Sequence, residues 1–158
     1  MSWHFEQKEL EELYKEFSSE SDIVLPVLAG SYIDKMMREL LLNKLSKGNT
    51  SKQLLTPGKG RLSEYQIKAD LLYCLEIISK EIYQDITRIG EIRNKFAHSH
   101  EKLSFTTKQI VEEINKLKSP RDKHADRVSK LKSNPERTDF VLAVSSIIVK
   151  LNESLIGG

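Results

Sequence analysis

The sequence has 158 residues, which is close to the usual size of one domain. Its 39% of hydrophobic and 30% of charged residues supply enough apolar surface to fold, and no run approaches the roughly 20 apolar residues of a membrane span. This composition excludes a disordered chain and an integral membrane protein. It predicts a single folded domain over residues 1–158.

The cysteine content and the first residues bear on the cellular compartment. Cys74 is the only cysteine, which excludes an intrachain disulfide framework and agrees with a reducing environment. The start of the sequence has no positive n-region followed by an apolar h-region and a small-residue cleavage site. We therefore expect a cytoplasmic protein without a membrane partner.

The charge is small overall but unevenly distributed along the chain. A formal net charge of +2 is too small to indicate nucleic-acid binding. Acidic residues are concentrated in residues 1–20, namely Glu6, Glu9, Glu11, Glu12, Glu16 and Glu20. Basic residues are concentrated in and around residues 118–137, namely Lys116, Lys118, Arg121, Lys123, Arg127, Lys130, Lys132 and Arg137. Such runs usually form solvated surfaces, and a ligand-binding patch is the alternative interpretation.

Two helices are predicted in the first 45 residues. Apolar residues at i, i+3, i+4 and i+7 predict an amphipathic helix over residues 6–17, within the acidic segment 1–20. Glu9, Glu12 and Glu16 share its exposed face, which makes them candidates for binding a basic partner protein. A longer core helix is predicted over residues 24–45 from its high apolar content, and its proline is tolerated because it lies in the first turn.

The middle of the chain contains a loop and two further helices. Residues 46–61 carry two turn signals and are predicted to be weakly structured. Ser63 is predicted to be the N-cap of a third helix, whose apolar stripe extends to Ile78 and includes Cys74. Cys74 is therefore expected to be a small core residue and not a nucleophile. Ser79 is predicted to cap a fourth helix over residues 80–97.

Two more helices complete the predicted fold. Thr106 or Thr107 is predicted to cap a fifth helix that ends before a proline. The basic segment, residues 118–137, is predicted to be mainly a loop, and Thr138 is predicted to cap a last helix that extends to about Leu155. No window shows strand alternation with hairpin turns. The predicted fold class is all-α, a single compact bundle of about six helices.

One charged residue lies inside the apolar face of the fourth predicted helix. At about 100° per residue, Arg93 falls in the middle of a narrow apolar stripe. The stripe consists of Ile82, Ile86, Ile89 and Phe96. A guanidinium group keeps its proton in proteins, so it must find carboxylates, carbonyls or an anionic ligand, or point into a cleft or across an interface.

His98, at the end of the same helix, is the second candidate residue. Histidine exchanges protons near neutral pH, so Arg93 and His98 form a candidate catalytic pair, with Asn94 expected on the other side of the helix. In the structural alternative, Arg93 pairs with a core carboxylate such as Asp70 and His98 caps the C-terminal end of the helix. The residues alone leave both interpretations open.

Other chemical sites find little support in the sequence. His4, His100 and His124 have no second ligand at a metal-site spacing. The Gly-Lys-Gly sequence at residues 58–60 lacks the spacing and the preceding strand of a phosphate-binding loop. We predict neither a metal ion nor a cofactor.

Several stretches of the chain resemble the mannitol operon repressor family. The resemblance rests on GRLS at 60–63, IKADLLY at 67–73, IISK at 77–80, YQDI at 83–86 and IRNKFAHS at 92–99, and it extends more weakly over residues 21–45 and 134–151. Within it, Arg93, Asn94 and His98 form an Arg-Asn-x-x-x-His motif. This motif is also similar to that of the HEPN superfamily of helical domains.

The family resemblance implies an all-α fold and a regulatory role without a DNA reader of its own. The sequence agrees, because it has no helix-turn-helix pair with a polar recognition helix, and its basic segment lacks aromatic residues for stacking on bases. Direct DNA binding is therefore not expected. The main interpretation is a non-enzymatic protein that acts through protein–protein contacts, either as a transcriptional co-regulator or as the neutralising immunity partner of a toxin.

The HEPN resemblance implies a different function, that of a metal-independent ribonuclease. Catalytic members of that superfamily bring the Arg and His of two chains together, and a homodimer is compatible with this interpretation. Carried over, His98 would act as general base or acid on the 2′-hydroxyl, Arg93 would stabilise charge on the phosphate, and Asn94 would position the pair. The basic segment would then guide the RNA backbone. The motif as an inherited structural lock is the alternative.

Overall fold

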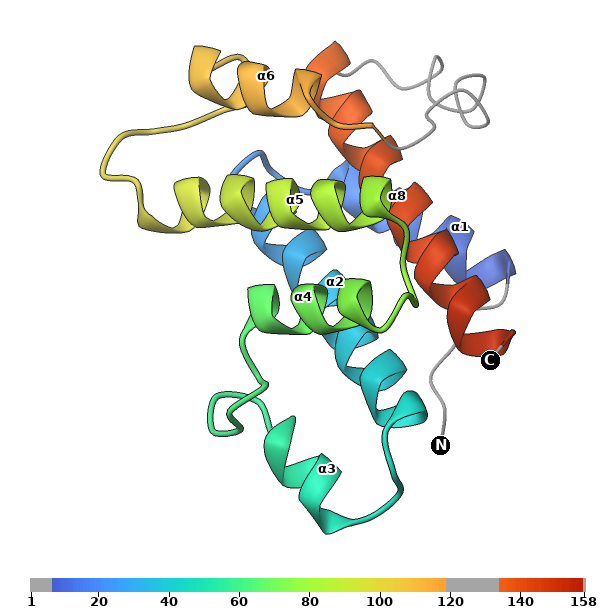
Figure 1. The fold of residues 1–158 in the computed structure, drawn as a ribbon. Helices are drawn as coiled ribbons and strands as arrows, with labels where there is room; N and C mark the ends of the chain where they lie inside the picture. The colour runs from blue at the N-terminus through green and yellow to red at the C-terminus, as the bar shows by residue number, and fades with distance from the viewer. Residues whose placement is uncertain (1–6, 119–133, 158) are drawn as a thin grey trace.

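The computed structural model describes residues 7–118 and 134–157, apart from the side chains of residues 7, 9, 10, 13 and 14. These ranges form seven helices and no strand (Figure 1). The helices are α1 (Gln7–Ser19), α2 (Val24–Lys44), α3 (Asn49–Leu54), α4 (Tyr65–Cys74), α5 (Lys80–His98), α6 (Lys108–Asn115) and α8 (Pro135–Ile156). The predicted all-α fold is confirmed. The additional helix, compared with the predicted six or so, is α3. It is a short helix within residues 46–61, a segment that the sequence predicts to be weakly structured.

α2 is the central helix of the described fold. It packs against α1, α4, α5 and α8, and α6 packs across α5 and α8. α3 and α6 lie at opposite ends of the molecule (Figure 1). The helix is apolar on most of its circumference, with Leu25, Ala29, Ile33, Met36, Met37, Leu40 and Leu41 all buried. A helix buried on several sides in this way holds its neighbours in place.

The apolar stripes predicted for the fourth and last helices are confirmed. Ile86 and Ile89 of α5 and Ile147 of α8 are fully buried. Aromatic rings connect these helices, because Phe105, in the loop before α6, stands between Phe96 and Phe140. Its ring centroid lies 5.5 Å from that of Phe96 and 5.3 Å from that of Phe140.

Two of the predicted helix starts can be compared directly with the structure. The Ser79 side chain accepts a hydrogen bond from the Ile82 backbone N–H at 3.2 Å, which confirms it as the N-cap of α5. The prediction for Thr138 is wrong. α8 begins four residues earlier, where the Asn134 side chain accepts from the Glu136 N–H at 2.8 Å and a proline occupies the first helical position.

Two further N-cap predictions concern α4 and α6. Ser63 is not the N-cap of α4, because that position is taken by Glu64 and the Ser63 hydroxyl instead donates to the Gly60 carbonyl at 2.6 Å. Thr107 is at the N-cap position of α6, but its Oγ1 accepts from the N–H of Ser104 (3.0 Å) and makes no capping bond to the helix.

α4 is shorter than predicted and turns a different face to the core. It ends at Cys74 because Glu76 adopts a left-handed backbone with φ of 59°. The N–H of Ile77 donates to the Leu72 carbonyl at 2.9 Å, which closes the helix as a Schellman motif.

Cys74 is exposed, so the prediction that it is a core residue is wrong. The residues of α4 that are buried are Tyr65, Lys68, Ala69 and Leu72. The charged Lys68 interrupts this stripe in the sequence, and the apolar pattern therefore pointed to the neighbouring face of the helix.

The predicted basic loop is only partly covered by the structure. Residues 119–133 lie outside the described residues, whereas residues 135–137 belong to the first turn of α8 and are not part of a loop. No helix in the described ranges is long and apolar enough to cross a membrane.

Candidate functional site

Arg93 lies where α5 crosses α2, and a glycine of α2 makes room for it. The side chain of Arg93 is half-buried. A Cβ atom at Gly30 would stand 2.5 Å from Arg93 Cδ, far closer than carbon atoms approach one another. Glycine at residue 30 therefore lets the arginine stem pass directly over the backbone of α2.

The guanidinium group of Arg93 stacks on the aromatic ring of Tyr65 from α4. Arg93 Cζ lies 4.7 Å from the ring centroid, within the range of a cation–π contact. The Tyr65 hydroxyl donates to the Ile86 carbonyl at 2.7 Å, which fixes the ring. A Cβ at Gly90 would stand 2.6 Å from Tyr65 Cε1, so a second glycine leaves space for the ring.

A buried lysine and a carboxylate stand next to this aromatic ring. Lys68 is 2% exposed, and its Nζ donates to the Ser63 carbonyl at 2.8 Å. The same Nζ lies 2.7 Å from Asp34 Oδ1, as an ion pair without the angles of a hydrogen bond. We call Gly30, Asp34, Tyr65, Lys68, Gly90 and Arg93 the Arg93 cluster.

The charges of Arg93 and Asp34 both act on the phenol of Tyr65. Burial is the main reason why the pKa of Tyr65 lies above its ordinary value. The positive charge of Arg93 lowers this pKa and the negative charge of Asp34 raises it, so both charges are close to the phenol. Two cations and one carboxylate leave a net charge of +1 at the junction of α2, α4 and α5.

The other two residues of the predicted motif lie near the end of α5. Arg93 Nη2 donates to Asn94 Oδ1 at 3.4 Å, a long hydrogen bond between exposed groups. His98 is exposed and is the last residue of the helix. It lies five positions after Arg93, which is about 140° around the helix axis. Among the described residues, no hydrogen bond or ion pair joins His98 to Arg93.

The partner suggested for Arg93 in the structural alternative is engaged elsewhere. Asp70 Oδ1 accepts from the Tyr83 hydroxyl at 2.7 Å and from Gln66 Nε2 at 3.0 Å. The hydrogen bond to Asp70, followed by burial, raises the pKa of Tyr83. The suggestion that Asp70 satisfies Arg93 is therefore wrong, and the guanidinium group instead stacks on the ring of Tyr65.

The predicted acidic surface is partly described by the structure. Glu12 and Glu16 are exposed on α1, and the side chain of Glu9 lies outside the description. Glu16 faces Tyr32 of α2, where burial and the nearby carboxylate both raise the pKa of the phenol. Glu16 thus already has a contact within the chain, which sets it apart from a freely solvated glutamate.

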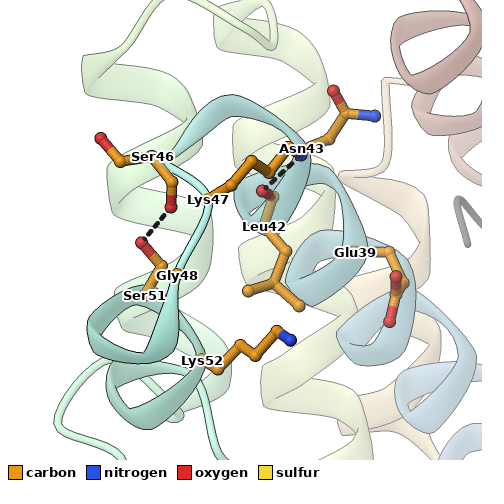
Figure 2. Close-up of a pocket in the computed structure, with 8 residues that line it drawn as sticks. All are labelled: Glu39, Leu42, Asn43, Ser46, Lys47, Gly48, Ser51 and Lys52. Atoms are coloured by element: carbon orange, nitrogen blue, oxygen red, sulfur yellow. Dashed lines mark hydrogen bonds between the residues drawn. The ribbon is translucent and has the colours of Figure 1, made fainter.

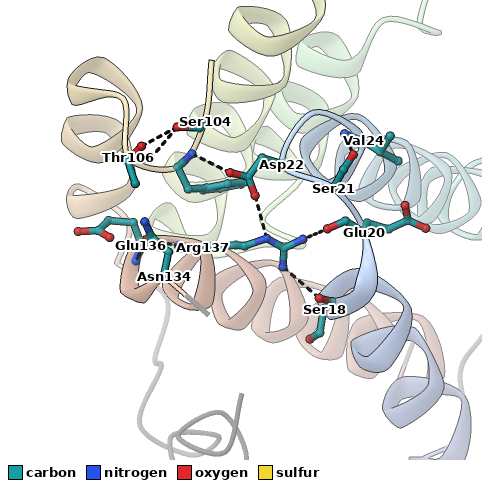
Figure 3. Close-up of polar contacts among 11 residues, drawn as sticks. Ser18, Glu20, Ser21, Asp22, Val24, Ser104, Thr106, Asn134, Glu136 and Arg137 are labelled. Atoms are coloured by element: carbon teal, nitrogen blue, oxygen red, sulfur yellow. Dashed lines mark hydrogen bonds and ion pairs between the residues drawn. The ribbon is translucent and has the colours of Figure 1, made fainter. Parts of the chain in front are cut away.

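Arg137 forms a second polar cluster, at the start of α8 (Figure 3). Its Nε pairs with Asp22 Oδ1 at 3.1 Å, and its two terminal nitrogens donate to the carbonyls of Ser18 and Glu20. The other carboxylate oxygen of Asp22 accepts from the N–H of Phe105 at 3.3 Å. These bonds engage all three nitrogens of an arginine that is only 9% exposed, so we assign it a structural role.

A surface depression of about 230 Å³ lies where α2 turns into α3 (Figure 2). It is lined by Glu39, Leu42, Asn43, Ser46, Lys47, Gly48, Ser51 and Lys52. The Ser51 hydroxyl donates to the Ser46 carbonyl at 2.6 Å, and Lys47 Nζ donates to the Leu42 carbonyl at 3.4 Å. These contacts hold the turn together, and no acid–base pair is present among the lining residues.

The described side chains also offer no metal-binding cluster. Within residues 7–118 and 134–157, no group of three or more His, Cys, Asp and Glu side chains could hold a metal ion. The Arg93 cluster is therefore the strongest candidate site in the described part of the chain.

A comparison with protein families identifies the chain. A family model described as mannitol repressor, MtlR, matches residues 29–153. The chain belongs to the mannitol repressor family. The matched range contains the whole Arg93 cluster and Arg137 but leaves out the acidic helix α1. No curated protein sequence matches this family member.

Two solved structures share the fold of this mannitol repressor family member. One is a chain in the structure of the MtlR–HPr complex from Escherichia coli, with a TM-score of 0.70 and 17% identity over 90% of this chain and 98% of that one. The other is a possible transcriptional regulator, YggD, from Shigella flexneri, with a TM-score of 0.70 and 17% identity over 90% of this chain and 97% of that one.

The sequence pointed to Arg93 but missed the residues that hold it. Gly30 and Gly90 each lie inside a helical pattern, where a glycine often marks a close approach, and this was the available signal. Tyr65 and Lys68 gave no such signal, because each sits at the start of a short helix whose buried face contains a charge.

Proposed function

We propose that this protein is a transcriptional co-regulator of the mannitol repressor type, which acts in the cytoplasm by binding another protein, and that HPr is its partner. One observation carries the proposal. The chain belongs to the mannitol repressor family and has the fold of a chain in the MtlR–HPr complex over nearly the whole length of both.

The surface of the molecule supports a role based on protein contacts. Arginine is one of the residue types enriched in the energetically important centres of protein interfaces, and Arg93 is held in place by its stacking on the buried Tyr65. Three aliphatic residues, Ile23, Val24 and Val27, are 40–52% exposed at the start of α2. Exposed aliphatic side chains next to such an arginine favour a protein partner over the backbone of DNA.

The family also favours a co-regulator over the immunity partner of a toxin. A regulator should affect transcription, whereas an immunity protein should protect cells from a toxin encoded nearby. Deletion of the gene separates the two roles. We expect the transcripts of sugar-transport genes to change by several fold, and re-expression of the chain to restore them.

Purified protein provides the matching control in vitro. We expect no retardation of the promoter DNA of those genes by the chain alone, because its effect passes through another protein. Unchanged transcripts together with growth arrest by a neighbouring toxin would instead establish the immunity role. Retardation of the promoter by the chain alone would establish a direct DNA-binding repressor.

A second candidate function is the metal-independent ribonuclease. The Arg-Asn-x-x-x-His motif favours it, and the exposed His98 is accessible to a substrate. In that case His98→Ala should abolish cleavage of RNA in the presence of a chelator and leave the melting temperature unchanged, since loss of a proton-transfer group typically lowers the rate about 10²–10⁴-fold. We expect the wild-type protein to leave the RNA intact.

A further inference from the structure

The exposed aliphatic residues of α2 lie on the same side of the helix as the Arg93 cluster. Ile23, Val27 and Gly30 are spaced at i, i+4 and i+7, so they form one stripe along α2. Arg93 crosses α2 directly at Gly30. The arginine therefore stands at the end of a short aliphatic stripe in which Ile23 and Val27 are 52% and 40% exposed.

The guanidinium group of Arg93 is positioned but not satisfied by the described residues. Its stem is confined by Gly30 and its planar face by the ring of Tyr65. The hydrogen bond to Asn94 is long, at 3.4 Å, and no other described residue accepts from the group. An arginine held in one orientation loses little side-chain entropy when it binds, which favours its use at an interface.

The net charge of the Arg93 cluster determines which charge a group of the partner should carry. Asp34 is already paired with the buried Lys68 at 2.7 Å. The positive charge of Arg93 is thus the excess charge of the Arg93 cluster, and a carboxylate matches both this charge and the planar fork of the guanidinium. The aliphatic stripe matches an apolar side chain next to that carboxylate.

We infer that Arg93 and the stripe formed by Ile23, Val24 and Val27 are the surface that docks the protein partner, through an acidic residue of that partner flanked by an aliphatic side chain. The inference rests on the proposed function and names the surface that would perform it. We call these four residues the Arg93 docking surface. Tyr65 and Gly30 are positioning residues, because they orient Arg93 without contacting the partner.

Gly30→Ala provides an unusual test of this surface. The added methyl group displaces the arginine stem but keeps its charge, and alanine is the better helix former. We expect the melting temperature to stay within a few degrees of the wild type. A structural role for Arg93 alone would leave binding unaffected by this variant, whereas the Arg93 docking surface predicts weaker binding.

The experiment is a calorimetric titration with the HPr encoded by the same genome. Arg93→Ala should weaken binding at least about 30-fold, as for a central interface arginine. Val27→Asp and Gly30→Ala should each weaken it about tenfold. The control is Lys108→Glu on α6, a larger change of charge at a side chain that is 92% exposed, and it should change the dissociation constant less than about twofold.

Several results would overturn the inference. Equal binding of HPr by the wild type and by Arg93→Ala would show that the Arg93 docking surface does not bind HPr, while the proposed function would still hold. Absence of HPr binding by the wild type would contradict both the docking surface and the proposed function. A wild-type dimer in sedimentation that Arg93→Ala converts to a monomer would assign this face to a second copy, and loss of RNA binding alone in Arg93→Ala would assign it to RNA.

Discussion

At the scale of single residues, backbone conformation at Glu76 decides where α4 ends. Glu76 is the non-glycine residue with positive φ in the described part of the chain, and its side chain is exposed. A left-handed backbone costs roughly 1–2 kcal/mol for a residue with a Cβ. Glycine avoids this strain, although it loses more chain entropy on folding.

The first prediction follows from that comparison. Glu76→Gly should raise the free energy of unfolding by about 1 kcal/mol, because the relief of strain exceeds the loss of entropy. Glu91→Gly, which removes an exposed glutamate inside α5, is the matched control and should lower it by about 1 kcal/mol. Urea denaturation measures both. A destabilised Glu76→Gly variant would mean that the left-handed turn is not the native helix end.

At the scale of helices, α6 is attached to α5 by a largely buried ion pair. Glu113 Oε2 of α6 lies 2.8 Å from Arg88 Nη1 of α5, and Lys116 Nζ lies 3.3 Å from the other oxygen. Burial raises the pKa of Glu113, but the hydrogen bonds from Lys116 and Arg88 outweigh it, so the pKa lies below its ordinary value of 4.5.

The second prediction concerns the pH dependence of this attachment. A folded-state pKa below 4.5 means that the carboxylate stabilises the fold fully above pH 4.5 and that this contribution is lost as pH falls through the lower, folded-state pKa. Glu113→Gln should therefore lower the free energy of unfolding by about 1–2 kcal/mol at pH 7. The difference from the wild type should shrink below pH 4.5. A difference that grows on acidification would contradict the assignment.

The helices also show which part of the fold the sequence could predict. Long elements with a clear apolar periodicity, such as α2 and α5, were predicted almost to the residue. α4 was placed with the wrong face inward, because the buried Lys68 is satisfied by Asp34 and a carbonyl that are distant in sequence. Arg93 was found because a charge stood inside an apolar stripe, but its aromatic neighbour Tyr65 belongs to another helix and no local pattern connects them.

At the scale of the whole molecule, Arg137 connects segments from both ends of the chain. It joins the first turn of α8 to the connection between α1 and α2, and through Asp22 to the loop before α6 (Figure 3). The contacts span 115 or more residues of sequence. Such long-range bonds cannot be read from a local motif, and no sequence pattern separates Arg137 from the other residues of the basic segment.

The third prediction tests this connection. Arg137→Ala should lower the free energy of unfolding by about 2–4 kcal/mol, because it removes the ion pair with Asp22 and the hydrogen bonds to two backbone carbonyls. Arg137→Lys should lose less of the free energy of unfolding, since lysine keeps the charge but not the planar guanidinium fork. Hydrogen exchange should increase at α1 and at the start of α8 together. An increase confined to α8 would show that Arg137 does not connect the two ends.

The proposed regulatory role requires the whole molecule to bind its partner protein directly. Isothermal titration of the purified wild-type chain with the HPr encoded by the same genome measures that binding most directly. We expect saturable binding that weakens as salt increases, because a cationic surface takes part. No heat of binding with HPr, together with retardation of promoter DNA or cleavage of RNA by the same preparation, would contradict it.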